Sequence, residues 1–237
     1  MRRIAILPAR GGSKRIPNKN IKDFNGKPII AYILHALKQS NLFNEIHVST
    51  ESSLIADVVR RCGTDIKFPR PDDLADDYTT IMPVVQYVIS KYRELGIEYD
   101  EVWIVMPCTP LIDCDDIKRA ADAFIDKKNN GPMIAVAEYP VPIEWAFSMN
   151  HIGELSPVKP GAFSIRSQDL GKKYYDAGAF SVYTSEHLKG LAMNSLDVGM
   201  SGFILSSEKV VDIDDMNSWN LAESLYLSKI GKKFLNE

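Results

Sequence analysis

The sequence predicts an α/β fold, a Rossmann-like arrangement with a mainly parallel sheet and helices on both of its faces. In the first two-thirds of the chain, short β-rich runs alternate with longer helical patterns, an order typical of parallel sheets with right-handed crossovers. The chain has 237 residues, of which 45% are hydrophobic and 25% charged. This is the composition of a globular protein and the length of one α/β domain, so residues 1–237 are expected to form a single domain.

The expected strands are short runs of β-branched and apolar residues. Two of them, Arg3–Pro8 and Glu101–Met106, are almost continuously apolar, as in strands that are covered on both faces. The expected strands are Arg3–Pro8, Glu45–Thr50, Glu101–Met106, Met133–Ala137, Ala179–Tyr183 and Lys209–Ile213. Ligands on such sheets bind beyond the carboxyl ends of the strands, so a site is expected directly after Pro8.

The segments between these strands have the apolar spacing of amphipathic helices. Pro28 suits the first position of a helix, where its missing N–H would have no partner. Ser52 and Asp115 are expected to cap the helices that follow them. The expected helices are Pro28–Gln39, Ser52–Arg61, Ile81–Leu95, Asp115–Lys128 and Ser218–Leu235.

The regular alternation breaks down between about Tyr139 and Tyr175. Four prolines interrupt this stretch, and its large apolar residues, Trp145, Phe147 and Phe163, follow no period. We expect residues 139–175 to form an insertion within the domain, either a lid or an arm that packs on a second subunit.

The composition argues against several classes of protein. With 28 Lys and Arg against 31 Asp and Glu, the net charge is −3, which gives no reason to expect binding to nucleic acid or to an anionic membrane. No apolar run approaches the ~18–20 residues of a membrane span. Cys62, Cys108 and Cys114 are too few and too badly spaced for a disulfide framework or a zinc site. We expect them to be buried thiols in a cytoplasmic protein.

A basic loop with two adjacent glycines follows the first expected strand. Residues 10–22 read RGGSKRIPNKNIK, with five basic residues and no acid. The glycines would let backbone N–H groups turn toward an anion, and Arg10, Lys14 and Lys19 could then neutralise a triphosphate. The spacing matches neither the P-loop nor the GxGxxG fingerprint. The loop therefore predicts a polyphosphate site, and a solvated basic loop is the alternative.

Asp212 and Asp214 stand two residues apart in the alternating segment Val211–Asp214. On a strand, such positions face the same side, with ~6.6 Å between their Cα atoms. Two neighbouring carboxylates repel each other unless a cation lies between them, and oxygen ligands suit Mg²⁺. A magnesium site is one interpretation, and an acidic pair that faces water on an edge strand is the other.

Five motifs occur in separated parts of the chain. They are LPARGGSKRIPNKNI with GKPII near the start, STES (Ser49–Ser52), RPDDLADD (Arg70–Asp77), PCTPL (Pro107–Leu111) and VDID (Val211–Asp214). In this order they resemble the CMP-sialic acid synthetase family, the cytidylyltransferases that activate nonulosonic acids. The resemblance covers nearly the whole chain. It implies a CTP-dependent nucleotidyltransferase that converts a nine-carbon sugar acid to its CMP-sugar and releases pyrophosphate.

The resemblance also implies roles for individual residues. Asp212 and Asp214 would hold Mg²⁺ as the cofactor, and Asp214, Lys19 and Arg10 would form the catalytic set, with Asp214 favoured to take the proton of the attacking hydroxyl. The implied CTP-binding residues are Arg10, Gly11, Gly12, Ser13, Lys14, Lys19, Asn20 and Arg70. The resemblance further implies a homodimer, in which the 139–175 arm crosses between subunits.

Further segments favour one branch of this family. RSQDL (Arg166–Leu170) with YDAGAF (Tyr175–Phe180), and YPVPIEW (Tyr139–Trp145), resemble the pseudaminic acid branch. The sialic acid branch usually has Gln and Arg where this chain has Met106 and Ile112. Pseudaminic acid is therefore the leading substrate, with N-acetylneuraminic, legionaminic and 3-deoxy-octulosonic acid as alternatives. The expected sugar-binding residues are Arg166, Gln168 and Asp176, although Arg166 could instead form a salt bridge between subunits.

Two other functions stay open at this point. One is a nucleotidyltransferase that uses another base or an aldose phosphate, and the absence of a clear GxGxRL-type signature argues against it. The other is a non-catalytic regulatory module that binds nucleotide-sugars. Such a module would tolerate the loss of the acidic pair, and both acids are present.

Overall fold

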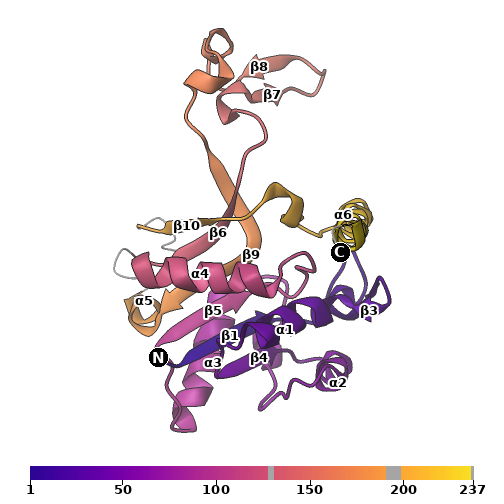
Figure 1. The fold of residues 1–237 in the computed structure, drawn as a ribbon, viewed down its shortest axis with the longest axis vertical. Coiled ribbons are helices and arrows are strands. Elements are labelled where there is room, and N and C mark those ends of the chain that lie inside the picture. Colours follow the sequence, from indigo (N-terminus) through magenta and orange to yellow (C-terminus); the bar gives the residue numbers. More distant parts are fainter. Residues whose placement is uncertain (128–130, 191–198, 236–237) are drawn as a thin grey trace.

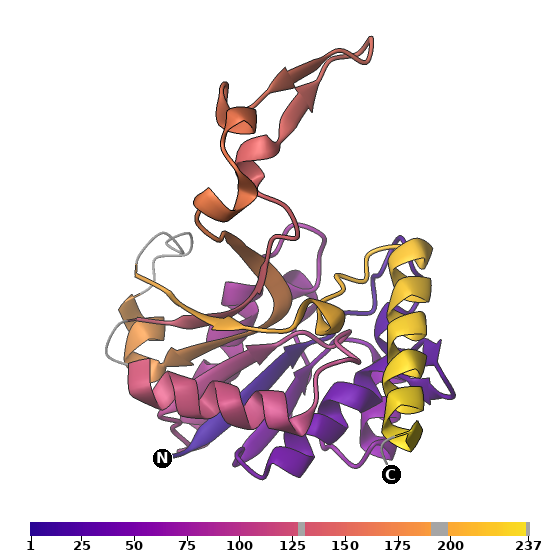
Figure 2. The same ribbon diagram turned by 45° about the horizontal axis from the view of Figure 1, so that its top comes forward.

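The computed structural model describes residues 1–127, 131–190 and 199–235 (Figure 1). Six strands form one sheet in the order β10–β6–β9–β5–β1–β4, and helices cover both of its faces (Figure 2). This arrangement confirms the predicted fold class. The sheet strands are β1 (Arg3–Pro8), β4 (Glu45–Ser49), β5 (Glu101–Val105), β6 (Met133–Glu138), β9 (Tyr174–Thr184) and β10 (Ser201–Ile204), and the helices are α1 (Ile29–Ser40), α2 (Ser53–Arg61), α3 (Ile81–Glu94), α4 (Cys114–Lys127), α5 (Ser185–Gly190) and α6 (Met216–Leu235).

Most neighbouring strands are parallel, but β9 is not. β1 pairs in parallel with β4 and β5, and β6 pairs in parallel with β10. β9 runs antiparallel to both β5 and β6. The chain leaves the sheet at the carboxyl end of β6 and returns beside it, since Glu138 pairs with Tyr174. The returning strand therefore runs back along β6.

The two faces of the sheet are buried to different extents. In β1, Ala5 and Leu7 pack in the cluster that contains α1 and α4, whereas Ile4 and Ile6 pack in the cluster that contains α3. Both clusters exclude water, and each buried Ile or Leu contributes about 1.5–3 kcal/mol. In β6 only every second residue is buried. The α3 side of the sheet is therefore covered over β1 and β5 and left partly open over β6.

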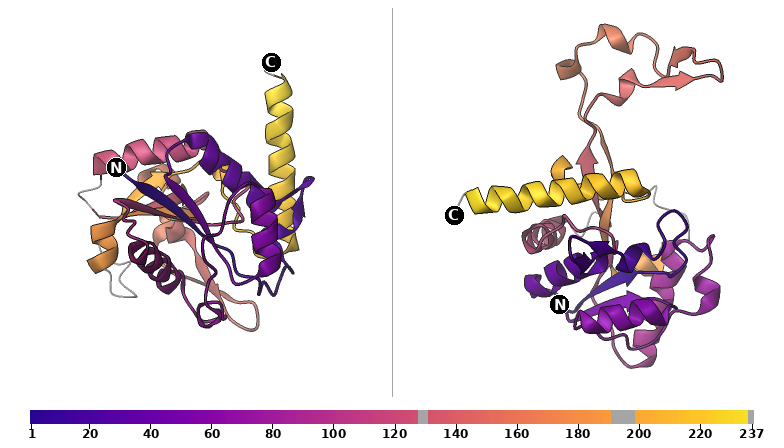
Figure 3. Two further views of the ribbon diagram at one scale, coloured as in Figure 1. Left: turned by 90° about the horizontal axis from the view of Figure 1, so that it is seen from below. Right: turned by 90° about the vertical axis from the view of Figure 1, so that its right-hand side faces the viewer.

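A third apolar cluster connects the two ends of the chain. The short hairpin of β2 (Asp23–Phe24) and β3 (Lys27–Pro28) packs against α6, where Phe24 lies 5.5 Å from Trp219 between ring centroids. Ile213, just before α6, is buried in the same cluster. Figure 3 shows α6 beside this hairpin, outside the sheet and its covering helices. The cluster fixes the C-terminal segment against the loop that follows β1.

The helix starts differ in part from the sequence expectations. Ser52 caps α2 as predicted, because its Oγ accepts the Ile55 N–H at 3.4 Å. Pro28 precedes α1 instead of occupying its first position, since it belongs to β3. The prediction that Asp115 caps the fourth helix is wrong. Asp113 and Asp116 form a reciprocal capping box, in which each carboxylate accepts the other's backbone N–H at 3.1 Å.

The predicted strand Lys209–Ile213 is wrong, and with it the strand geometry expected for Asp212 and Asp214. Residues Ser207–Lys209 form a short 3₁₀ helix, and residues 210–214 contain no strand. The last sheet strand is instead β10, which pairs with β6. The 210–214 segment is held by a side chain rather than by a neighbouring strand, since the Lys19 ammonium donates to the Ile213 carbonyl at 2.6 Å.

The segment between β6 and β9 projects from the body as an arm (Figures 1 and 2). It carries a small hairpin of β7 (Phe147–Met149) and β8 (Leu155–Pro157). Phe163 stacks on Phe147 and on Trp145, with ring centroids 5.0 and 5.8 Å apart. The arm is therefore ordered by its own aromatic contacts, while much of its apolar surface stays exposed.

Two smaller expectations can be compared with the structure. The three cysteines are free, and each is partly buried. The expectation of buried thiols is therefore met only in part. Among the described residues, no helix has the length and apolar character that a membrane crossing requires.

The capping box of α4 leads to a stability prediction. Asp116 is fully buried and accepts Lys209 at 2.5 Å and Arg119 at 2.6 Å. Asp116→Asn leaves Arg119 without a charged partner and leaves Lys209 with Asp113 alone, so we expect a loss of about 2–3 kcal/mol in the free energy of unfolding. The matched variant is Asp115→Asn, on the exposed side of the same turn, which should change it by less than about 0.5 kcal/mol. Urea denaturation measures both, and equal losses would contradict the assignment of the cap to Asp116.

Candidate active site

A cavity of about 460 Å³ lies at the carboxyl ends of β1 and β5. This is the edge where ligands bind on α/β sheets. Its wall combines the loop after β1, the segment after β5, Gly178 of β9 and the segment before α6. The lining residues are Pro8, Arg10, Ser13, Lys14, Arg15, Ile16, Lys19, Asn20, Met106, Pro107, Cys108, Gly178, Val211, Asp212, Ile213 and Asp214.

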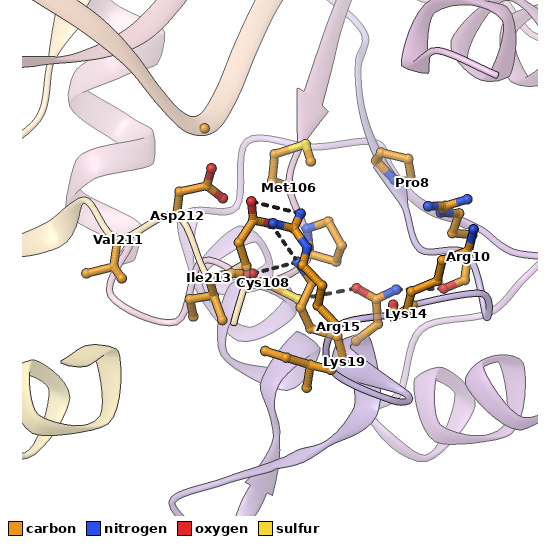
Figure 4. Close-up of a pocket in the computed structure, with 16 residues that line it drawn as sticks. Pro8, Arg10, Lys14, Arg15, Lys19, Met106, Cys108, Val211, Asp212 and Ile213 are labelled. Carbon is orange, nitrogen blue, oxygen red and sulfur yellow. Dashed lines mark hydrogen bonds and ion pairs between the residues drawn. The ribbon is translucent and has the colours of Figure 1, made fainter. Parts of the chain in front are cut away.

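The cations and the carboxylates of this cavity come from two different segments of the chain. Four cations come from one loop, and two carboxylates, Asp212 and Asp214, come from the segment before α6. In Figure 4, Arg10 and Lys14 lie on the opposite side from Asp212, with Arg15 and Lys19 between them. Such a wall attracts an anionic ligand to the loop side and a cation to the carboxylate side. The structure thus brings together the basic loop and the acidic pair that the sequence analysis placed in one site.

Asn20 holds the two ends of the basic loop together. Its side-chain N–H donates to the Arg10 carbonyl at 2.9 Å, and its carbonyl oxygen accepts the Cys108 thiol at 3.3 Å. Burial raises the pKa of Cys108 to about 12. Cys108 is therefore a neutral donor here and not a nucleophile. Asn20 therefore fixes the backbone of the loop at Arg10, whose side chain lines the cavity.

The two glycines do not line the cavity. The Gly11 N–H donates to the Glu51 carboxylate at 2.6 Å, so it does not point at an anion in the cavity. A Cβ at Gly11 would lie 3.1 Å from the Ser52 Cβ, whereas one at Gly12 would meet nothing within 4 Å. Gly11 is therefore needed for close packing on the start of α2. The sequence analysis did not single out Glu51, and its place within the STES motif was the available signal.

A second residue that the sequence analysis did not single out is Asp77. The Arg10 guanidinium donates to its carboxylate at 2.8 Å and to the Asp76 carbonyl at 2.7 Å, and Lys14 forms an ion pair with the same carboxylate. Hydrogen bonds from Lys14 and then Arg10 lower the pKa of Asp77. The 72–80 loop therefore places the Asp77 carboxylate beside Arg10 and Lys14, the two cations that lie farthest from Asp212 and Asp214.

The acidic side of the cavity is tied to the same loop. Arg15 forms an ion pair with Asp214 at 2.9 Å, and Lys19 lies 3.7 Å from the other oxygen of that carboxylate. Asp212 is exposed to the cavity. Among the residues that the structure describes, no three His, Cys, Asp or Glu side chains converge as a metal site. Two carboxylates alone fit Mg²⁺, which takes its remaining oxygens from water and substrate phosphates.

The remaining predicted site residues lie outside this cavity. Arg70 is buried, and its guanidinium donates to the Ser49 carbonyl at 2.7 Å and to the Ser49 hydroxyl at 3.1 Å. Burial lowers the pKa of Arg70. Arg166 and Gln168 lie in the arm, where Arg166 pairs with Asp169 at 2.8 Å. Asp176 lies in β9, on the wall of a second cavity.

The model of a protein family described as cytidylyltransferase matches residues 4–203. The chain belongs to the cytidylyltransferase family. Among similar proteins, this cytidylyltransferase is 36% identical over 227 residues to the pseudaminic acid cytidylyltransferase of Campylobacter jejuni, covering 95% of this chain and 97% of the relative. It is 31% identical over 238 residues to the CMP-N,N′-diacetyllegionaminic acid synthase of Legionella pneumophila, covering 95% and 96%.

Solved structures show the same fold. A CMP:2-keto-3-deoxy-manno-octonic acid synthetase in complex with CTP superposes with a TM-score of 0.71 and 16% identity, over 97% of this cytidylyltransferase and all of that chain. A 4-diphosphocytidyl-2C-methyl-D-erythritol synthase from Anaerococcus prevotii gives a TM-score of 0.61 and 11% identity, over 96% and 98%. At these identities the likeness concerns the fold alone.

The Asp77 contacts lead to a binding prediction. A polyphosphate at Arg10 and Lys14 must compete with the Asp77 carboxylate, so Asp77→Asn should tighten the binding of inorganic triphosphate about 3- to 10-fold at low ionic strength. Titration calorimetry measures the affinity. Asp72→Asn, a change of charge at an exposed position in the same loop, should leave it nearly unchanged. Weaker binding in the Asp77 variant would show that this carboxylate organises the loop for its ligand.

Proposed function

We propose that this cytidylyltransferase uses CTP to convert a nonulosonic acid, with pseudaminic acid as the leading substrate, to its CMP-sugar. The observation that carries the proposal is the cavity in which four cations of one loop face Asp212 and Asp214. A triphosphate needs such cations, and a transfer at its α-phosphorus needs a group to receive a proton beside them. The 36% identity to a pseudaminic acid cytidylyltransferase, over nearly the whole length of both chains, supports the choice of acid.

In the proposed reaction, the oxygen of the anomeric C2 hydroxyl of the sugar acid attacks the α-phosphorus of CTP. A new P–O bond forms as the bond to the bridging oxygen breaks, and pyrophosphate leaves with that electron pair. Arg10, Lys14 and Lys19 neutralise the triphosphate and the departing pyrophosphate. The hydroxyl proton passes to Asp214, directly or through a water molecule. Mg²⁺ held by Asp212 and Asp214 would, when bound, supply further neutralisation of the phosphate oxygens.

Ser13, Asn20 and the two glycines belong to the same proposed CTP site, in different ways. Ser13 lines the cavity, while Asn20 and Gly11 fix the loop through the Arg10 carbonyl and the Glu51 carboxylate. Arg70 stays in the proposal as a neighbour of the nucleotide. Its guanidinium contacts Ser49 at the carboxyl end of β4, so it can act by positioning the 49–51 segment.

The names of the relatives indicate the kind of sugar acid. One relative is a CMP-N,N′-diacetyllegionaminic acid synthase. Another, from Helicobacter pylori, combines a pseudaminic acid cytidylyltransferase with a hydrolase of a UDP-linked 2,4-diacetamido-2,4,6-trideoxy sugar. It is 28% identical over 206 residues, covering 85% of this chain and 39% of that longer protein. We therefore propose a substrate with acetamido groups and few hydroxyls, and keep legionaminic, N-acetylneuraminic and 3-deoxy-octulosonic acid as alternatives.

We also propose that the arm joins two copies of the chain into a homodimer. The arm exposes apolar side chains that a single subunit leaves uncovered: Val141 (61%), Phe147 (46%), Met149 (71%), Ile152 (67%), Leu155 (57%), Val158 (62%) and Phe163 (54%). Exposed apolar surface of this extent is typical of an interface. Arg166 and Gln168 lie on the arm and do not line the cavity of their own subunit. We propose that they contact a sugar acid in the site of the second copy, and that Asp176 contacts it from β9.

The dimer proposal gives a direct prediction. Sedimentation velocity at micromolar concentration should show a dimer for the full chain. Met149→Glu with Leu155→Glu, which places charges on the exposed hairpin, should shift the population to monomer. Leu95→Glu, at an exposed apolar position after α3, is the matched control and should leave the dimer intact. A fully active monomer in the unmodified chain would contradict the proposal.

The test of the proposed reaction is pyrophosphate release with and without Mg²⁺, over a panel of nucleoside triphosphates and sugar acids. We expect release with CTP and a nonulosonic acid only. Asp212→Asn and Asp214→Asn keep the side-chain shape and remove one charge, so each should lower kcat by about 10²-fold or more. The neighbouring Asp215 carboxylate accepts the Ser218 backbone N–H at the start of α6. Asp215→Asn should therefore retain most activity.

Two results would contradict the proposal. If the double variant with Asp212→Asn and Asp214→Asn makes the CMP-sugar at the unmodified rate, the acidic pair has no part in the reaction. If the unmodified chain binds CMP-sugars and releases no pyrophosphate with any acid, the regulatory module becomes the better description.

A further inference from the structure

Two lysines, one on each side of the segment that carries the acidic pair, converge on one carboxylate. Lys209 precedes this segment, and its ammonium lies 2.7 Å from an oxygen of Asp113. Lys229, in α6, lies 2.7 Å from the same oxygen and donates to the Leu111 carbonyl at 3.3 Å. Lys209 also contacts Asp116, at 2.5 Å. We name Lys209, Lys229, Asp113 and Asp116 the lysine–aspartate cluster.

The cluster joins two walls of the catalytic cavity. Asp113 and Asp116 lie at the start of α4, and the 106–108 segment, which comes shortly before them in the chain, lines the cavity. Lys209 stands three positions before Asp212, so at most roughly 10 Å of chain separates the Cα atoms of these two residues. The contact of Lys209 with the start of α4 therefore influences how far the acidic pair lies from the 106–108 wall.

Apolar packing does not fill the space around the two lysines. A cavity of about 180 Å³ lies between the 206–209 turn and α6, and both lysines line it. The Lys209 side chain is only 21% exposed, and the Asp116 side chain is fully buried. Charged hydrogen bonds in such a place are strong, and salt screens them less than it screens surface ion pairs. The cluster therefore contributes directly to fixing this turn against α4.

The charges of the cluster reinforce one another. Burial acts to raise the pKa of Asp113, but hydrogen bonds from Lys209 and Lys229 outweigh it and hold that pKa well below its usual range. Burial acts to lower the pKa of Lys209, and hydrogen bonds to Asp113 and Asp116 raise it on balance. Opposite charges therefore stay in contact near neutral pH, and the cluster is a permanent part of the fold.

We propose that Lys209 is a positioning residue, whose ion pairs at the start of α4 fix where Asp212 and Asp214 lie in the catalytic cavity. This inference rests on the proposed function, in which the two carboxylates receive a proton and hold Mg²⁺. In an enzymatic transfer, a displacement of about 1 Å can lower the rate by as much as 10²-fold. Lys209 does not line the catalytic cavity, so it acts through the 210–214 segment and not on the substrate.

Arg119 provides the matched control. Its guanidinium pairs with the same Asp116 carboxylate at 2.6 Å, but Arg119 and Asp116 both belong to α4. This ion pair therefore joins no second segment to the helix. Lys209→Met and Arg119→Met each remove one cation beside Asp116, and only the first releases the turn before the acidic pair. Lys209→Arg keeps the charge and is the conservative variant.

Steady-state kinetics of the full chain, with CTP and a nonulosonic acid, separates positioning from stability. We expect Lys209→Met to lower kcat about 10-fold, while the KM for CTP stays within about 2-fold because the basic loop is untouched. Lys209→Arg should recover most of the lost kcat. Arg119→Met should retain kcat within about 2-fold. Urea denaturation shows whether each variant is folded under the assay conditions.

Mn²⁺ binding without turnover gives a second readout. The EPR signal of free Mn²⁺ measures its affinity for the chain without nucleotide, and loss of the site in Asp212→Asn identifies it. Lys209→Met should weaken this binding about 5-fold, because two carboxylates share one ion only when their separation is fixed. Calorimetry with inorganic triphosphate, in the absence of metal, should give the unmodified affinity.

Lys229→Met tests the same inference from the other side of the segment. It removes the second lysine from Asp113, so it should lower kcat and the Mn²⁺ affinity in the same direction as Lys209→Met. This variant decides the question if Lys209→Met does not fold. Lys91→Met, which removes an exposed lysine paired with Glu94 on α3, should match the unmodified chain in both values.

Three outcomes overturn the inference. If Lys209→Met and Arg119→Met lower kcat by the same factor, Lys209 has only a structural role. If Lys209→Met leaves both kcat and the Mn²⁺ affinity unchanged, the acidic pair does not depend on it. If it raises the KM for CTP and leaves kcat unchanged, Lys209 acts on the nucleotide. Inactivity of the unmodified chain with every acid instead contradicts the proposed function, and the Mn²⁺ measurement then still tests the position of the acidic pair.

Discussion

The ammonium group of Lys19 joins two parts of the chain that are nearly 200 residues apart in sequence. It donates to the Ile213 carbonyl at 2.6 Å and lies 3.7 Å from the Asp214 carboxylate. The segment that carries the acidic pair has no neighbouring strand to fix it, so this contact, the Arg15–Asp214 ion pair and the burial of Ile213 hold it in place. The position of the carboxylates relative to the basic loop depends on these interactions.

The sheet supports this arrangement at two levels. Parallel β1 and β5 deliver the basic loop and the 106–108 segment to one edge, as the crossover topology requires. The reversed strand β9 adds the irregular turn at Gly178, which lines both the catalytic cavity and a second cavity beside it. The arm and this wall of the site are adjacent in sequence, because β9 follows the arm and carries Gly178.

Much of this architecture could be predicted from the sequence, where local pattern decides. The near-continuous apolar runs of β1 and β5 and the cap at Ser52 follow from periodicity and hydrogen-bonding chemistry alone. The alternation at Val211–Asp214 led to a wrong strand prediction. It arises because Ile213 packs on α6 and the hairpin, and a strand would show the same alternation. β10 has only four residues, including a glycine, and its pairing with β6 is set by tertiary contact.

The site itself was predictable in composition but not in its internal contacts. The basic loop and the acidic pair could be located because their charges are clustered in sequence. Glu51 and Asp77 act through contacts across 40 and 67 positions of the chain, and no local pattern shows such pairs. We expected the backbone N–H groups of the glycines to face an anion. The Gly11 N–H instead donates to Glu51, which lies far away in the sequence.

The most direct test of the central claim is a crystal structure of the chain with CTP and Mg²⁺. The account predicts that the triphosphate lies between Arg10, Lys14 and Lys19, that its α-phosphate faces Asp212 and Asp214, and that Asp77 has released Arg10. A triphosphate bound away from this loop, or one whose α-phosphate faces away from the acidic pair, would contradict it.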